Sequence, residues 1–190
     1  LYPGQALVLS QESMRTQSAS VLGYAYPNVQ ETALRGILPY ASALCPFTYG
    51  ITEDGGLLPP ADGHLTALAL EYGVQPLLHL STLAEGGGFS ALRAQAVLES
   101  DALRARLIAE TVAQMRRGGY GGVDVDFEFL GAELADAFAG FLGELRAAVH
   151  AAGGTVVCAL APKTSAEQRG VLYEGHDYRR IGENADAVLL

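Results

Sequence analysis

Three acidic residues alternate with apolar residues in one short segment of the chain. Asp124, Asp126 and Glu128 are separated by Val125 and Phe127. Alternate side chains of a β-strand point to opposite faces, so the acids are expected to share one face and the apolar residues the other. Carboxyl groups crowded on a buried face cannot all stay ionised, so at least one is expected to hold a proton near neutral pH. Such a stack is a means of making a general acid.

Two other interpretations of this segment remain open. An exposed strand with a solvated acidic face requires a different fold, because parallel sheets covered by helices have no solvated face. A Mg²⁺ site is compatible with carboxylates. Such a site usually draws acids from several strands, and here the further candidates are two loop residues, Asp54 and Glu85.

Short β-rich runs alternate with longer helical patterns along the chain, which predicts an α/β fold: a parallel sheet with helices outside it. The expected strands cover 21–26, 44–51, 74–80, 122–129, 155–160 and 187–190, and helices are expected over 29–41, 62–73, 134–152 and 178–184, with two more between 89 and 117. Six strands fit a doubly wound sheet or part of an eight-stranded barrel. In a barrel the apolar face of the fourth strand must meet the helices, so the acids point inward. Glu128 then lies nearest the C-terminal end, where barrel enzymes place their reacting groups.

Glycine patterns and composition exclude several classes of protein. The first expected strand is not followed by Gly-x-Gly-x-x-Gly, and Gly86–Gly88 is not followed by Lys and Ser or Thr, so nucleotide folds are disfavoured. A net charge of −9 disfavours binding to nucleic acid. No apolar run reaches the ~18 residues needed for membrane insertion. Cys45 and Cys158 fall in expected strands and are interpreted as reduced core thiols.

Gly122-Val-Asp-Val-Asp-Phe-Glu128 resembles the signature of glycoside hydrolase family 18, Asp-Gly-x-Asp-x-Asp-x-Glu on the fourth barrel strand. Ala159–Ser165 and Gly175–Tyr178 are similar to the fifth-strand region of the branch that degrades the cortex of bacterial spores. The resemblance implies a (β/α)8 TIM barrel, truncated here to about its first six strands, over residues 21–190. Residues 1–10 are similar to the tail of a LysM peptidoglycan-binding module, which leaves 11–20 as a linker.

The resemblance also implies a reaction and its residues. The substrate's own N-acetyl oxygen would attack the anomeric carbon, in retaining cleavage of β-1,4 bonds after N-acetylglucosamine. Glu128 would protonate the glycosidic oxygen and later activate water, Asp126 would orient the acetamido group, and Asp124 would share a proton with Asp126. The implied substrate is spore-cortex peptidoglycan or another N-acetylglucosamine-containing glycan, reached in the spore coat, the cortex or the cell wall. No cofactor or metal is implied.

Aromatic residues near the ends of the first two strands are candidates for sugar binding. In the family such residues form the floor of the sugar subsite, because sugar faces stack on aromatic rings. The candidates here are Tyr24, Tyr26, Phe47 and Tyr49. His79, in the third expected strand, is interpreted as a packed or hydrogen-bonded histidine rather than a catalytic one.

The chain departs from the family pattern at three points. Gly121 replaces the first Asp of the signature, and Phe127 replaces a common Trp in a chain with 0 Trp, which argues against an enzyme of crystalline chitin. The sixth strand lacks the family's Met-x-Tyr-Asp, so the 190-residue chain alone is expected to be inactive. The alternatives are a chitinase or endo-N-acetylglucosaminidase of the same family, a non-catalytic sugar-binding barrel, and a metal-dependent barrel enzyme.

Overall fold

The computed structural model describes residues 19–190, which form an α/β fold with parallel strands in chain order. The expectations of a LysM tail over 1–10 and of a linker over most of 11–20 lie outside the described residues. The parallel strands are β1 (Leu22–Ala25), β2 (Ala43–Pro46), β5 (Gln75–Pro76), β6 (Leu78–Ser81), β7 (Gly122–Asp126), β8 (Thr155–Ala159) and β9 (Ala187–Leu189).

The strands pair in the orders β1-β2-β5 and β6-β7-β8-β9. Leu77 alone separates β5 from β6, and a parallel bridge between Tyr49 and Leu80 joins the segment after β2 to β6. The third expected strand is therefore observed as two short strands, and all six expected strands are present in sequence order.

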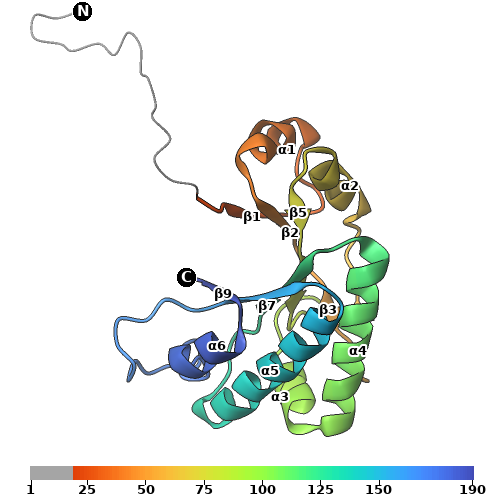
Figure 1. Cartoon of the computed structure of the whole chain (residues 1–190). Coiled ribbons are helices and arrows are strands. Elements are labelled where there is room, and N and C mark those ends of the chain that lie inside the picture. The colour runs from red at the N-terminus through yellow and green to blue at the C-terminus, as the bar shows by residue number, and fades with distance from the viewer. Residues whose placement is uncertain (1–18) are drawn as a thin grey trace, which may run out of the picture.

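The helices are α1 (Glu31–Ile37), α2 (Gly63–Glu71), α3 (Ala91–Glu99), α4 (Asp101–Gly118), α5 (Ala135–Ala151) and α6 (Tyr178–Asn184), with 3₁₀ turns η1 (Leu38–Tyr40) and η2 (Ala132–Leu134). Figure 1 shows α1 and α2 beside β1, β2 and β5, and α3 to α6 beside the strands that follow. Among the described residues, no helix combines the length and the apolar character that a membrane span requires.

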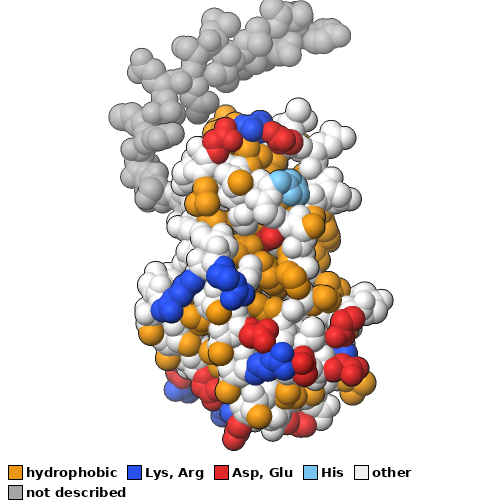
Figure 2. Space-filling model, turned by 90° about the vertical axis from the view of Figure 1, so that its right-hand side faces the viewer, with side chains coloured by type: hydrophobic (Ala, Val, Ile, Leu, Met, Phe, Trp, Pro, Cys, Tyr) orange, Lys and Arg blue, Asp and Glu red, His pale blue; other side chains and the backbone are white. Residues whose placement is uncertain are grey.

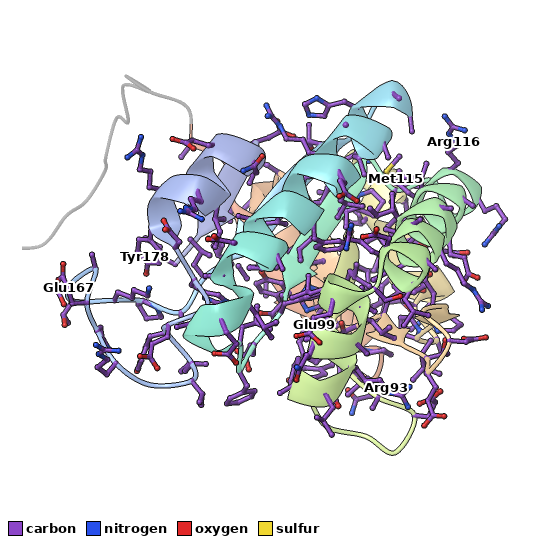
Figure 3. All side chains as sticks on the ribbon, turned by 90° about the horizontal axis from the view of Figure 1, so that it is seen from below. Arg93, Glu99, Met115, Arg116, Glu167 and Tyr178 are labelled. Carbon is purple, nitrogen blue, oxygen red and sulfur yellow. The ribbon has the colours of Figure 1, made fainter. Side chains whose placement is uncertain are left out.

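Local sequence explains where α4 begins and ends. The Ser100 hydroxyl accepts a hydrogen bond from the backbone N–H of Leu103, and Gly119 ends the helix with a φ of 71°. These are the capping residues that helix termini favour. Figure 3 shows Met115 turned from α4 toward the interior and the next residue, Arg116, turned away from it. The helix thus presents one apolar face to the sheet.

The second expected strand, 44–51, does not continue without a break. β2 ends at Pro46, and β3 (Gly50–Ile51) pairs antiparallel with β4 (Leu57–Leu58). Proline has no N–H to donate to a strand ladder. At Gly50 the backbone lies so close to the Leu83 carbonyl that a Cβ would be 2.3 Å from its oxygen. The segment after β2 is therefore redirected.

Two apolar clusters hold the layers together. The larger lies between β6 to β8 and α3 to α5, and the smaller between β1, β2, α1 and α2.

Cys45 and Cys158 are buried free thiols, which confirms the expectation for both. On the face shown in Figure 2, the basic side chains at the top and near the bottom lie next to acidic ones, and others at mid-height lie near one another.

Candidate functional site

The three acids lie at the C-terminal end of β7, on the face opposite the apolar residues. Asp124 is fully buried, Asp126 ends the strand, and Glu128 follows it in a half-buried position. The alternate residues Val123, Val125 and Phe127 are all buried in the larger apolar cluster. The alternation predicted from the sequence is therefore observed.

His79 joins the acids through the pairing of β6 with β7. The strand register places His79 opposite Asp124 and Ser81 opposite Asp126. His79 Nδ1 lies 2.7 Å from Asp124 Oδ2, and Nε2 lies 3.7 Å from Asp126 Oδ2. The expectation of a hydrogen-bonded histidine is confirmed, but its partner makes it part of the site. The available signal was the alternation of polar His79 and Ser81 with Leu78 and Leu80, which matches the alternation in β7.

The environment of Asp126 favours its protonated form. Burial raises the pKa of Asp126 to about 6; the His79 ring opposes this shift, and the charges of Glu128 and Asp124 add to it. The expectation that one acid holds a proton near neutrality agrees with this direction. Direct sharing of a proton between Asp124 and Asp126 stays a prediction, because the hydrogen bond that the structure shows for Asp124 is with His79.

The Tyr24 phenol and the Cys45 thiol lie near the fully buried Asp124. Burial, followed by the charge of Asp124, raises the pKa of the Tyr24 phenol and of the Cys45 thiol far above their ordinary values. Both groups therefore keep their protons. Asp124 Oδ1 has no hydrogen-bond partner among the described residues, although it is buried. An unpaired buried carboxyl oxygen is costly to the folded state.

A cavity of about 420 Å³ opens above the acids. Asp126 and Glu128 line it together with Tyr24, Tyr26 and Phe47, so five of the seven predicted site residues come together here. The ring of Phe47 lies 4.9 Å from those of both Tyr26 and His79. The other walls of the cavity come from the ends of β8 and β9 and the loop between them: Ala159, Leu160, Ala161, Pro162, Leu172, His176, Leu189 and Leu190. Aromatic and apolar walls around carboxyl groups suit a sugar, which has apolar faces and polar edges.

Tyr49 lies apart from this cavity, which corrects its predicted place in the sugar site. Its side chain is 2% exposed in the larger apolar cluster, and its hydroxyl lies 3.2 Å from that of Tyr120 and accepts a hydrogen bond from Gln114. Because β2 ends at Pro46, the alternation that would have placed Tyr49 beside Phe47 is lost.

The loop candidates for a metal site are engaged elsewhere. Asp54 pairs with Arg106, and Glu85 pairs with Arg93. Among residues 19–190, no three His, Cys, Asp or Glu side chains are grouped as a metal site requires.

His176 ties the loop after β7 to the loop after β8. It is 2% exposed; its Nε2 lies 2.9 Å from the Phe127 carbonyl oxygen, and its Nδ1 accepts from the Ala161 N–H at 3.1 Å. This pattern requires a neutral ring with its hydrogen on Nε2. The adjacent Gly175 donates to the Leu130 carbonyl at a contact too close for a Cβ. The backbone on both sides of Glu128 is therefore held by residues from the second loop.

We expect His176 to make the protein less stable in acid. Burial lowers the pKa of His176 below its ordinary 6.5. Above about pH 6.5 the ring is neutral in both the folded and the unfolded state, so its bonds contribute fully. As the pH falls through this window toward the lowered pKa, the unfolded state binds the proton first and stability is lost. Denaturant unfolding of the complete gene product from pH 8 to pH 5 measures this loss.

The matched variant is His176→Gln, whose amide can replace both hydrogen bonds without titrating. The difference in unfolding free energy between the wild type and His176→Gln is expected to shrink below about pH 6.5. The exposed His64 on α2 supplies the control, since His64→Gln should show no such change. A constant difference across the whole range for His176→Gln would contradict the assignment of a neutral ring.

Comparisons with known proteins find relatives of this chain in sequence and in structure. No protein-family model matches the chain. The chain is 36% identical to the cortical fragment-lytic enzyme of Bacillus subtilis (strain 168) over 163 residues, which are 86% of this chain and 37% of that protein. The spore cortex-lytic enzyme SleL of Bacillus megaterium QM B1551 superposes with a TM-score of 0.89 and 29% identity, over 95% of this chain and 43% of SleL.

A chitinase from Chromobacterium violaceum superposes with a TM-score of 0.80, over 90% of this chain and 55% of the chitinase chain. At 23% identity this likeness shows the fold alone. The chain spans little more than a third of the length of its curated relative. The α/β fold is confirmed, and the chain is related in sequence to a cortex-lytic enzyme over most of its length.

Proposed function

We propose that the chain carries a large part of a family 18 glycoside hydrolase barrel, and that the protein cleaves β-1,4 bonds after N-acetylglucosamine in spore-cortex peptidoglycan. The observation that carries this proposal is the placement of Asp126 and Glu128 side by side in an aromatic-lined cavity. Its support is the relation to the cortical fragment-lytic enzyme, which is named for a cortex substrate.

The geometry suits a substrate-assisted mechanism. Glu128 is half-buried at the cavity, where it can donate a proton to a glycosidic oxygen and later accept one from water. Asp126, with a pKa raised to about 6, can hydrogen-bond the acetamido N–H and then carry negative charge beside the positive intermediate. Tyr24, Tyr26 and Phe47 supply ring faces for the sugar. The reaction requires no cofactor or metal in this scheme.

The place of action follows from the substrate. A protein that degrades cortex peptidoglycan acts in the spore coat, the cortex or the cell wall, and a LysM module before the barrel would add affinity for the same polymer. Both are part of the proposal and rest on the resemblance of the sequence.

A chitinase is the second candidate, favoured by the shared fold with the Chromobacterium enzyme. The absence of Trp from the chain argues against crystalline chitin as its substrate. The sugar-binding barrel is the third. A protein that only binds sugar needs no general acid, so the presence of Glu128 at the cavity disfavours this candidate.

Mass spectrometry of released products distinguishes these functions. The complete gene product and its Glu128→Gln variant are incubated with cortex peptidoglycan and, separately, with chitin oligomers. We expect cortex fragments that end in a reducing N-acetylglucosamine from the wild type and none from the variant. Release from chitin alone would assign a chitinase, and tight sugar binding without release from either substrate would assign a sugar-binding protein. Loss of release in the presence of a chelator would favour the metal-dependent enzyme.

A further inference from the structure

The His79 ring lies between two of the three acids, with one nitrogen directed at each. Nδ1 is 2.7 Å from Asp124 Oδ2, and Nε2 is 3.7 Å from Asp126 Oδ2. The His79 and Asp124 side chains are 1% and 0% exposed, whereas that of Asp126 is 18% exposed. The ring thus connects the deepest acid to the acid at the cavity.

Aromatic neighbours hold the plane of this ring. Tyr24 meets it edge-on at 5.1 Å between ring centroids, and Phe47 stacks on it at 4.9 Å. A packed ring keeps both nitrogens in line with the carboxyl groups. The other titratable groups near the cluster are Tyr24 of β1, Cys45 of β2, Glu128 after β7 and Cys158 of β8. Burial raises the pKa of the phenol and both thiols, so these three groups stay neutral.

The bond to Asp124 determines what Nε2 can do. We assign the hydrogen between Nδ1 and Asp124 to the ring nitrogen, because a carboxyl oxygen can accept it there. In the neutral ring Nε2 is then an acceptor, and it is buried without a hydrogen-bond partner among the described residues. Asp126 Oδ2 is the carboxyl oxygen that faces this nitrogen, at 3.7 Å, and a protonated carboxyl there would have to approach by less than about 1 Å to donate to it.

We propose that His79 is the proton partner of Asp126: Nδ1 positions Asp124, and Nε2 accepts the proton of Asp126 when a positive intermediate forms in the cavity. The O–H bond of Asp126 breaks and an N–H bond forms at Nε2. A neutral carboxyl and a neutral ring become a carboxylate and an imidazolium, so the net charge of the three groups is unchanged. The inference rests on the proposed function, and His79 is a positioning residue because it acts through Asp126.

The kinetic test replaces His79 with Asn in the complete gene product. The Asn amide can still donate to Asp124 but has no atom at the Nε2 position. We expect kcat on the glycan to fall about 10²-fold with KM nearly unchanged. Because Nε2 is the acceptor for the Asp126 proton in this scheme, its loss should raise the pKa of that carboxyl and move the acidic limb of the pH profile of kcat/KM upward by about 1 pH unit. The exposed His64 on α2 gives the matched control, His64→Asn.

A merely structural histidine predicts a different result: an equal loss of rate at every pH, with the acidic limb unmoved. That outcome would overturn the inference. If His79→Asn does not fold, a second measurement leaves the ring in place. The ¹⁵N resonances of the histidine rings are recorded in the wild type, where that of His79 Nε2 is assigned through its connectivity to the backbone of the residue. The spectra are then compared with those of an Asp126→Asn variant.

We expect Asp126→Asn to shift the His79 Nε2 resonance at fixed pH, and the exposed Glu167→Gln to leave it unchanged. An unresponsive Nε2 would overturn the proton link. This measurement requires no turnover, so it separates the two proposals. A protein that cleaves no glycan but shows the Nε2 response contradicts the proposed function and supports the link.

Discussion

Replacing Glu128 with Gln is expected to lower kcat on N-acetylglucosamine-containing glycans by about 10²–10⁴-fold, with KM and folding close to those of the wild type. The amide has the shape of the carboxyl but cannot deliver an acidic proton to the leaving oxygen. Glu128 is half-buried at the cavity beside Asp126, so substrate can reach it. Steady-state rates on a soluble oligosaccharide measure the effect.

Glu167→Gln is the matched control for this prediction. Glu167 is exposed in the loop after β8, where Figure 3 shows it at the outer edge of the molecule. The same chemical change there should leave kcat within about twofold, since surface substitutions seldom perturb a site. A Glu128→Gln variant that keeps the wild-type rate would remove Glu128 from the role of general acid.

Phe127→Ala should cause the largest loss of stability, about 3–5 kcal/mol of unfolding free energy. Phe127 is 0% exposed, and its ring stacks on those of Phe138 and Phe141 at centroid distances of 5.6 and 5.3 Å. Truncation leaves a cavity between β7 and α5 and removes two aromatic contacts. Denaturant unfolding of the complete gene product measures the change.

The control for Phe127→Ala is Leu92→Ala on α3. Leu92 is 77% exposed, so its truncation should change the unfolding free energy by no more than about 0.5 kcal/mol. The Phe127→Ala variant also separates an effect on stability from an effect on catalysis. Below its melting transition Phe127→Ala should retain far more activity than Glu128→Gln, because its carboxyl groups are intact. A decrease in the unfolding free energy of Phe127→Ala below about 1 kcal/mol would contradict the prediction and show that neighbouring side chains fill the space left by the ring.

Local sequence was sufficient to predict the order of the elements and the face that carries the acids. A strand has a side-chain period of two, so the types of residues 123–128 alone place three carboxyl groups on one side. Local sequence also explains the start of α4, because Ser100 caps it. Beyond Pro46 the residue pattern predicted that the strand would continue to residue 51, but the backbone changes direction there and forms β3 and β4.

Contacts between distant segments could not be predicted in this way. His79 lies 45 residues before Asp124, and only the register of β6 against β7 brings its ring to that carboxyl group. His176 reaches the Phe127 carbonyl across a separation of 49 residues through the loop after β8. The alternation around His79 indicates a polar strand face, but it does not identify Asp124 as the partner, and nothing near His176 indicates Phe127, because both partners are set by strand pairing and loop packing.

By itself the sequence determined the α/β class and the shared strand face of the three acids, because both follow from periodicity and residue type within short segments, and it made Glu128 the candidate general acid. The tertiary structure alone decided that His79 joins Asp124 to Asp126, that His176 holds the backbone beside Glu128, and that Tyr49 packs against Tyr120 instead of lining the cavity. The physical reason is that burial and hydrogen bonding of these side chains depend on which strands and loops become neighbours. That choice is made by the packing of the whole chain.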